Sequence, residues 1–382
     1  MSKKAFFITS FAFPRYDAGA TRITMLAKAL RGQGYEVELC GMGDDVQFDG
    51  IVCRTLNPYR SNRICNSIAW RLIGMTAVAY VKSIIDDADV IVASFLPSSV
   101  VEKIKALCCE ADVVFAVDCT EWFTPEEFPH GVNDAGYIDH LRLLTEVIDS
   151  DVKVIAISSY LEDYFTEKGC SVLRVPSVLD NEELAPDLPV GLQSSAISVM
   201  YAGSPAVKDS LGVVLDSIDL LDRDVLGRIS FSFYGVSEDD LLHYAKKGTA
   251  LPACVHAYGR VSRKDVIAAL KNADFTILMR DPSMKFAQAG MPTKVTESLG
   301  CGTPVIANIT SDLGEYLVDG LNSIVVRNFS AEACAFALER AASLSVADRS
   351  SMRREALKSM RCGLDYRVYS VALDEFLCGG GA

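Results

Sequence analysis

The sequence predicts an α/β protein made of two Rossmann-like domains, each with a parallel β-sheet covered by helices on both faces. First, 50% of the 382 residues are hydrophobic and 23% are charged, as in a globular chain long enough for two ordinary cores. Second, short β-branched or aromatic runs alternate with helical patterns along the chain. Third, this alternation pauses once, over the polar residues 180–196, and then resumes for a similar length.

The first series begins with a strand, although residues 1–13 carry two lysines and a short apolar run. That run ends at 14–17, PRYD, without the small-residue cleavage site of a signal peptide. We predict strands at 5–9, 36–40, 51–54, 90–94, 113–117, 154–157 and 172–175, and helices at 21–33, 61–85, 98–107, 138–148 and 159–168. Near-continuous apolar strands between helices indicate a parallel sheet that is buried on both faces.

The second series follows the linker predicted at 180–196. We predict strands at 197–202, 229–234, 255–258, 275–278, 304–307 and 323–326, and helices at 211–221, 238–245, 263–271, 293–299, 331–343, 346–360 and 364–377. We place the domain boundary between residues 190 and 191, giving domains 1–190 and 191–382. The last helix, about 363–378, is a candidate to pack back on the N-terminal domain.

Composition and charge limit the kinds of partner that the protein is expected to bind. A net charge of −13 argues against nucleic acid as the main partner, but it permits a local basic pocket for a phosphorylated ligand. The twelve cysteines contain no C-x-x-C pair, which favours free thiols in a reducing cytoplasm over a zinc site or disulfides. The apolar run 68–81 is too short to span a bilayer and contains Arg71, so at most peripheral membrane contact is expected.

Three glycine turns follow predicted strands. Gly19 opens a helix whose free N–H groups could face an anion, although an ordinary helix start explains it equally well. The fingerprint G-x-G-x-x-G is absent there, which argues against a nicotinamide or flavin cofactor. Gly203 leads to Lys208 at a helix start, an arrangement that suits a diphosphate. Gly259 precedes Arg260 and Val261, where a base or phosphate could lie.

The most specific segment is 290–307, GMPTKVTESLGCGTPVIA. Glu297 precedes a glycine turn and a Pro-Val-Ile strand, with Glu315 and DGLNSIVV (319–326) farther along. This segment resembles the donor-binding core of the retaining GT-B glycosyltransferases of family 4. Gly203, Lys208, Gly235, Gly259-Arg260 and LKNADFTILMR (270–280) follow the family's order. The resemblance covers nearly the whole chain and is strongest in the second half. It implies the GT-B fold, with two Rossmann-like domains facing each other across a cleft.

The resemblance also implies roles for individual residues. Glu297 would grip the nucleotide ribose, because a carboxylate accepts hydrogen bonds from two hydroxyls at once. Lys208 would be the catalytic cation on the diphosphate, and Lys294 a second positive charge. The base would lie near Arg260 and Val261. The remaining donor-binding candidates are Gly19, Gly203, Gly290, Met291 and Thr293, with Arg280 replacing the arginine that many members carry where this chain has Ser204. Ala289 stands where the family's first glutamate is expected.

The acceptor side is represented by 117–128, VDCTEWFTPEEF. Carboxylates beside Trp122 and Phe123 at a strand end suit sugar recognition, and a solvated surface loop remains an equal alternative. The resemblance places Asp118 or Glu121 roughly where family members present a catalytic side chain to the donor sugar. The D-x-D of Asp87 and Asp89 precedes a strand, the wrong end of a parallel sheet for a metal site. No metal or cofactor is therefore expected.

These observations predict a cytoplasmic, metal-independent, retaining glycosyltransferase. It would bind a nucleotide diphosphate sugar in domain 191–382 and a glycan, lipid-linked or small-molecule acceptor in domain 1–190, in bacterial surface polysaccharide biosynthesis. Two alternatives remain open at this point. One is a nucleotide-sugar 2-epimerase of the same fold, which needs carboxylate acid–base pairs that only 118–127 supplies. The other is a non-catalytic nucleotide-sugar-binding subunit, suggested by Ala289.

Overall fold

The computed structural model describes residues 2–13, 17–57, 63–185, 196–204, 208–245 and 251–378, with side chains omitted at 57 and 63–73. It divides into two compact units. The first is Met1–Val178 together with Tyr366–Ala382, and the second is Leu179–Asp365. The predicted boundary between 190 and 191 lies outside the described residues. In the structure the second unit already begins at Leu179, and the chain from Tyr366 onward belongs to the first unit.

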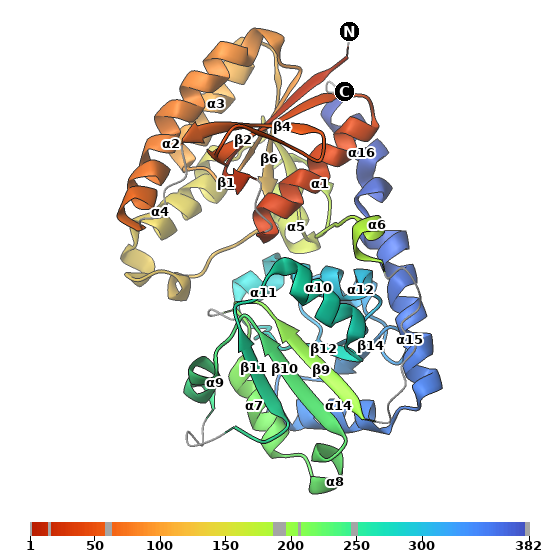
Figure 1. Cartoon of the computed structure of the whole chain (residues 1–382). Helices are drawn as coiled ribbons and strands as arrows, with labels where there is room; N and C mark the ends of the chain where they lie inside the picture. The colour runs from red at the N-terminus through yellow and green to blue at the C-terminus, as the bar shows by residue number, and fades with distance from the viewer. Residues whose placement is uncertain are drawn as a thin grey trace. The chain divides into compact units, whose positions relative to one another are not determined.

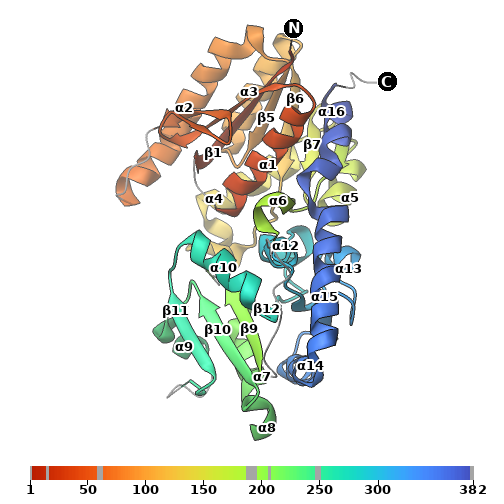
Figure 2. The ribbon, with the colours of Figure 1, turned by 45° about the vertical axis from the view of Figure 1, so that its right-hand side comes forward.

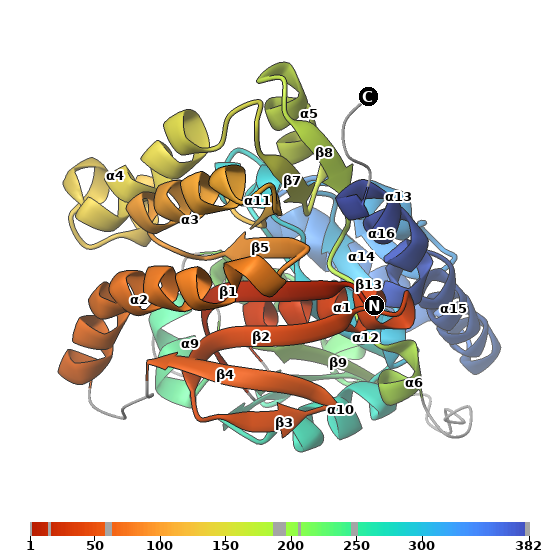
Figure 3. The same ribbon diagram turned by 90° about the horizontal axis from the view of Figure 1, so that it is seen from above.

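The first unit contains an eight-stranded sheet within the described residues, in the order β3-β4-β2-β1-β5-β6-β7-β8. All neighbours are parallel except β3 and β4, which pair antiparallel. Figure 3 shows β4, β2, β1 and β5 side by side. The strands are β1 (Lys4–Phe13), β2 (Glu36–Gly43), β3 (Val46–Phe48), β4 (Ile51–Asn57), β5 (Val90–Ser94), β6 (Val114–Cys119), β7 (Lys153–Ala156) and β8 (Ser171–Arg174).

Helices cover both faces of this sheet. Helix α1 packs with α16 over the core formed by alternate strand residues such as Phe7, Leu39 and Val92, and α2 packs with α3. Figure 1 shows the C-terminal α16 beside α1. The helical elements are α1 (Ala18–Gly32), α2 (Arg63–Ile84), η1 (Ile85–Asp87), α3 (Ser98–Glu110), η2 (Pro125–Glu127), η3 (Gly131–Asn133), α4 (Ala135–Arg142), η4 (Leu143–Val147), α5 (Ser159–Glu167), η6 (Tyr366–Tyr369) and α16 (Ser370–Cys378).

The second unit contains a six-stranded parallel sheet in the order β11-β10-β9-β12-β13-β14, within the part of the chain that is described. Its strands are β9 (Ile197–Ala202), β10 (Ile229–Tyr234), β11 (Val255–Gly259), β12 (Phe275–Leu278), β13 (Val305–Asn308) and β14 (Ser323–Val326). Both sheets alternate with helices along the chain, so the predicted class, α/β with two parallel-sheet domains, is confirmed.

Helices α7 and α14 pack together over one face of this sheet, and α12 packs against α15, as Figure 2 shows. The predicted linker is partly wrong, because residues 181–184 form helix α6, whose cap Asp180 accepts a hydrogen bond from the Glu182 N–H. The helical elements are α6 (Asn181–Leu184), α7 (Leu211–Asp219), α8 (Arg223–Leu226), α9 (Glu238–Tyr244), α10 (Arg263–Asn272), α11 (Lys285–Ala289), α12 (Thr293–Gly300), α13 (Leu313–Tyr316), α14 (Ala331–Ser343), α15 (Val346–Ser359) and η5 (Met360–Leu364).

The strand orders define one topological switch point in each sheet, where successive connections leave in opposite directions. In the first sheet it lies between β1 and β5, and in the second between β9 and β12. The carboxyl ends of parallel strands flanking such a point form a crevice, which is where doubly wound α/β proteins bind ligands. These two edges are therefore the first places to look for sites.

Two further findings concern the predictions about membrane contact and about the cysteines. Among the described residues, no helix combines the length and apolar character that crossing a bilayer requires. The cysteines whose side chains are described are all free thiols, and seven of them are buried, including Cys40, Cys301 and Cys334. A buried thiol that forms no disulfide packs as a small hydrophobic group.

Candidate functional site

A buried carboxylate gathers cations at the switch point of the second sheet. Asp209 lies in the loop after β9, with its side chain only 2% exposed. Its Oδ1 accepts from Arg280 Nε at 2.9 Å, and its Oδ2 is contacted by Lys294 Nζ. The Tyr201 hydroxyl also donates to Oδ2 at 2.8 Å. The cluster thus joins β9, the end of β12 and the first turn of α12.

The ionisation of this cluster follows from its contacts. Burial alone would raise the pKa of Asp209, but Lys294 and Arg280 outweigh it and hold that pKa below its ordinary value. Burial and the neighbouring Asp209 raise the pKa of Tyr201, so the phenol stays protonated and donates. Two basic side chains thus face one carboxylate, and burial lowers the pKa of Lys294 from its ordinary value even though Asp209 opposes this. Lys208, directly before Asp209, adds a third basic side chain, with its Nζ 5.9 Å from the centroid of the Phe286 ring.

Gly203 allows the chain to approach this cluster closely. It directly follows β9 and has a φ of 140°, a conformation that glycine adopts without strain. A Cβ at this position would collide with the aliphatic part of the Lys294 side chain. The absence of a side chain at residue 203 therefore permits Lys294 to reach Asp209 across the strand end.

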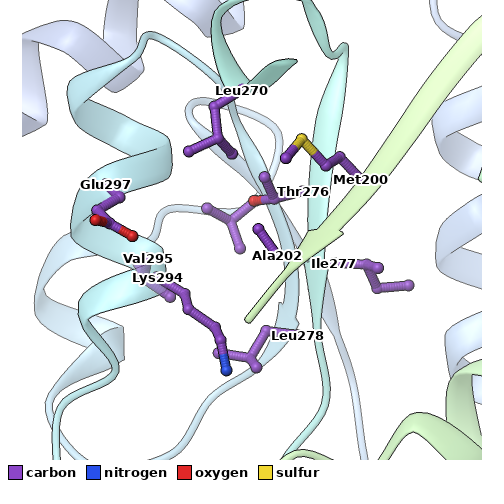
Figure 4. A pocket seen from close by; sticks show the side chains of 10 residues that line it. Met200, Ala202, Leu270, Thr276, Ile277, Leu278, Lys294, Val295 and Glu297 are labelled. Carbon is purple, nitrogen blue, oxygen red and sulfur yellow. The ribbon is translucent and has the colours of Figure 1, made fainter. Parts of the chain in front are cut away.

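Glu297 lies one turn beyond Lys294 on α12, and the two side chains project from the same side of that helix (Figure 4). Its Oε1 accepts from Arg263 Nη1 at 2.5 Å, and the side chains of Glu297 and Arg263 are 17% and 28% exposed. Arg263 is the first residue of α10, whose cap Ser262 accepts from the Asp265 N–H. Sequence reasoning did not identify Arg263, because a cation that opens a helix looks like any solvated surface residue.

A small cavity lies beneath these two side chains, between the sheet and α12. Met200, Thr276 and Leu278 are among its lining residues, together with Lys294 and Glu297 (Figure 4). Its volume of about 20 Å³ is enough for one water molecule and far too small for a nucleotide. A nucleotide would instead have to occupy the open edge formed by the strand ends.

The remaining donor-side candidates lie along that edge or beneath it. Arg260 and Val261 are exposed just after β11. The rings of Tyr234 and Tyr258, at the ends of β10 and β11, stack with centroids 4.6 Å apart and an angle of 7° between their planes. Sequence reasoning had not considered this pair.

The loop before α12 is more deeply placed than its predicted role in sugar binding suggests. Gly290 and Met291 are buried, and Met291 is 5% exposed. Thr293, half-buried, is the first residue of α12 and leaves its backbone at the helix N-terminus. Ala289 is fully buried at the end of α11. Backbone groups of this loop are therefore better placed to meet a ligand than the Met291 side chain.

Asp118 of the first unit is held in a buried ion pair. Arg22 contacts Asp118 Oδ1 through Nε and Nη2, both at 2.9 Å, and Ser94 donates to Oδ2 at 3.2 Å. Arg22 also donates to the carbonyls of Val175 and Pro176. Burial raises the pKa of Asp118 even though Arg22 opposes this. These contacts give Asp118 a positioning role between β5, β6 and α1, and they leave the half-buried Glu121 as the more accessible carboxylate.

Gly19, predicted to bind the donor, has a packing role in the structure. It is the second residue of α1, after the cap Asp17, whose side chain accepts from the Ala20 N–H. A Cβ on Gly19 would collide with the Phe11 ring. The glycine therefore makes room for an aromatic side chain from β1.

Gly19→Ala is expected to lower the free energy of unfolding by about 1–3 kcal/mol, because the added methyl overpacks against Phe11. Gly32→Ala, at the other end of α1, is the matched control, because nothing lies within 4 Å of a Cβ there. This change should raise the free energy of unfolding by roughly 0.5–1 kcal/mol. Urea denaturation of both variants measures the difference. Equal stability of Gly19→Ala and the parent protein would contradict the packing role.

Comparison with known proteins adds a family match. Residues 196–343, from β9 through α14, match the family described as Glycosyl transferases group 1. No curated protein sequence matches the chain significantly.

Solved structures match over the full chain. Sucrose-phosphate synthase from Thermosynechococcus elongatus has a TM-score of 0.73 at 13% identity, covering 98% of both chains. HepE from Anabaena in complex with UDP has a TM-score of 0.70 at 14% identity, covering 98% of this chain and 99% of that one. WaaG, a glycosyltransferase involved in lipopolysaccharide biosynthesis, has a TM-score of 0.65 at 14% identity, covering 99% and 100%. This likeness shows the GT-B fold and, together with the family match, supports a GT-B glycosyltransferase.

Proposed function

We propose that the protein is a retaining glycosyltransferase of family 4 that transfers a sugar from a nucleoside diphosphate sugar to a glycan, lipid-linked or small-molecule acceptor in bacterial surface polysaccharide biosynthesis. The observation that carries the proposal is the pairing of two basic side chains with Asp209 at the switch point of the second sheet, beside the Glu297 carboxylate on α12. Both lie within the family-matched residues 196–343. HepE structures hold UDP and UDP-glucose, which supports a uridine nucleotide as the first donor to test.

In this proposal Glu297 accepts hydrogen bonds from the two ribose hydroxyls, while Arg263 fixes the orientation of the carboxylate. Lys208 stabilises the negative charge that develops on the leaving diphosphate, aided by the cations paired with Asp209. The bond between the anomeric carbon and the diphosphate oxygen breaks as the acceptor oxygen bonds to the same face. The acceptor proton passes to the leaving phosphate, so the reaction requires neither a side-chain nucleophile nor a metal ion. We place the reaction in the cytoplasm, where the free thiols would stay reduced.

A thermal-shift panel of UDP, GDP, ADP and CDP, each with and without EDTA, tests this proposal. At a hundred times its Kd, the correct nucleotide should add about 2.7 kcal/mol to the free energy of unfolding, raising Tm by roughly 5–10 °C. The shift should be the same with EDTA, because lysine and arginine supply the positive charge. The absence of a shift with every nucleotide would contradict a donor site.

The panel's best nucleotide then guides a turnover assay with its labelled sugars. A labelled product that forms only when an acceptor is added supports transfer. Isomerisation of the sugar without an acceptor would instead identify a 2-epimerase. Nucleotide binding without turnover against a broad set of donors and acceptors would identify a non-catalytic subunit.

A further inference from the structure

Helix α15 buries two arginine side chains in the second unit. Arg349 is 2% exposed, and its Nη1 donates to Asp274 Oδ1, directly before β12, at 2.5 Å. Arg353 lies one turn later and is 6% exposed. Its Nη1 donates to the Ala273 carbonyl and its Nη2 to the Lys271 carbonyl, both at 2.5 Å. Arg353 therefore bonds directly to the C-terminal end of α10.

Arg353 is held by neutral groups rather than by a carboxylate. Among the described residues it forms no ion pair, and its two hydrogen bonds go to backbone carbonyls. Burial lowers the pKa of Arg353 even though Asp274 opposes this. Burying a guanidinium in this way is unfavourable, but its planar fork can bond two carbonyls at once in a fixed geometry. What the structure gains from Arg353 is thus a fixed position for the end of α10.

Helix α10 is anchored at its C-terminal end and lightly packed elsewhere. Of its ten residues, all of them described, only Leu270 is buried. The Leu270 carbonyl accepts from the Thr303 hydroxyl at 2.5 Å, and the Lys271 ammonium donates to the Ala185 carbonyl at 3.2 Å. Leu270 and Glu297 line the same small cavity, so side chains leave a space between α10 and α12 (Figure 4). Polar contacts at its C-terminal end therefore do most to set where α10 lies.

The opposite end of α10 carries Arg263, whose Nη1 donates to the Glu297 carboxylate. A ten-residue helix is about 15 Å long, so a tilt of about 4° around its C-terminal end moves its first residue by about 1 Å. A displacement of about 1 Å in a group that orients a ligand can cost as much as about 10²-fold in rate. The position of Arg263 thus depends on contacts made at the far end of its helix.

Helix α15 also contacts the helix that carries Glu297. One turn after Arg353, Leu357 lies against Gly302 in the turn that closes α12, where a Cβ would come within 3.1 Å of Leu357 Cγ. Helices α12 and α15 pack together along this side of the unit (Figure 2). One helix, α15, therefore holds both α10 and α12, the two helices that bring Arg263 and Glu297 into contact.

We propose that Arg353 is a positioning residue for the donor site, which holds the C-terminal end of α10 and thereby places Arg263 where it orients Glu297. This inference rests on the proposed glycosyltransferase function and adds to it a residue that touches no substrate. Its effect should appear in the affinity for the nucleotide, which a residue that only stabilises the unit would leave unchanged.

The test measures nucleotide binding to full-length variants by isothermal titration calorimetry, well below the Tm of each variant. The ligand is UDP, or whichever nucleotide of the panel gives the largest thermal shift. Arg353→Met removes both hydrogen bonds to α10 and should raise the Kd by about tenfold, as Arg263→Gln does. Arg353→Lys keeps a donor but not the fork, and its Kd should fall between those of the parent protein and Arg353→Met. In turnover assays the donor KM should rise with the Kd, while kcat changes by less than about twofold.

A double-mutant cycle with Arg263→Gln shows whether the effect passes through Arg263. If it does, adding Arg353→Met to Arg263→Gln should change the Kd by less than about twofold, although each change alone raises it about tenfold. Independent effects would multiply to about a hundredfold, and that result would overturn the proposal.

Arg349→Met is the matched control, because Arg349 is also a buried arginine of α15 and its ion pair goes to Asp274. It should lower Tm but leave the nucleotide Kd within about twofold of the parent value. The proposal is overturned if Arg353→Met binds the nucleotide as tightly as the parent protein, or if Arg349→Met weakens binding equally. The parent protein separates the two proposals. The absence of any nucleotide shift in it refutes the donor site, whereas a normal shift with an unchanged Kd in Arg353→Met refutes only the positioning role.

Discussion

Glu297→Gln is expected to lower kcat/KM for the donor by about 10²–10³-fold while the protein remains folded. Hydrogen bonds to a charged partner contribute roughly 1.5–3 kcal/mol each, and the amide retains only one accepting oxygen for the two ribose hydroxyls. The change also removes the negative partner of the half-buried Arg263. Initial rates at varied donor concentration measure the effect, and circular dichroism checks the fold.

Two further variants sharpen this result. Glu339→Gln, on the exposed side of α14, makes the same chemical change in the same unit and should leave kcat/KM unchanged. Arg263→Gln leaves the carboxylate in place but removes the group that orients it, so a smaller loss, about tenfold and mainly in donor KM, is expected. If Glu297→Gln turned over donor within twofold of the parent rate, the ribose assignment would fail.

Asp209→Asn is expected to be the most destabilising single change in the site, by about 3–5 kcal/mol. It leaves Lys294 and Arg280 without their counter-charge at a side chain that is 2% exposed, and an unpaired buried charge is costly. For a unit of this size the change corresponds to a fall in Tm of roughly 6–20 °C. Asp319→Asn is the comparison, because it removes one partner of the exposed ion pair between Asp319 and Arg340. It should lower the free energy of unfolding by no more than about 1 kcal/mol.

The pH dependence provides an independent check on Asp209. Its folded-state pKa is below its ordinary value, so the ionised form contributes stability that is fully present above the unfolded-state pKa. That contribution is lost as the pH falls through the lowered folded-state pKa. The gap between the free energies of unfolding of the parent protein and Asp209→Asn should therefore be widest near neutral pH and should narrow below about pH 4. A gap that stays constant from pH 7 to pH 3 would show that ionised Asp209 does not stabilise the fold.

The sequence predicted the architecture well because its signals are local. Apolar strands such as β10 and β12, and the amphipathic helices between strands, can be recognised from short stretches of sequence. In a parallel sheet the carboxyl ends of such strands lie at one edge. Lys208, Lys294 and Glu297 could therefore be placed near a common edge without a structure. The three-residue β3 and the four-residue α6 were missed, since elements of that length carry no periodicity.

The unforeseen parts of the sites depend on contacts between distant residues. Arg263 meets Glu297 across 34 positions, and Asp209 meets Lys294 across 85. No spacing rule connects such pairs, because the approach is set by the packing of α10 and α12 on the sheet. Gly19 is a different case: the anion binding that its local pattern suggested stays a prediction, and the tertiary contact with Phe11 gives the glycine a packing role that the pattern did not indicate.

The return of the C-terminal segment to the first unit has a consequence for biosynthesis. Leu373 and Leu377 of α16 are fully buried in the core that also contains Ile23 and Leu30 of α1. On the ribosome, the sheet of the first unit emerges before α16, so it lacks this covering until residues 370–378 have been translated. The second unit, continuous from Leu179 to Asp365, has no such delay. Of the two units, the one that begins earlier in the chain is thus the one completed later, and its exposed α1 face is the surface that chaperones would have to protect in the meantime.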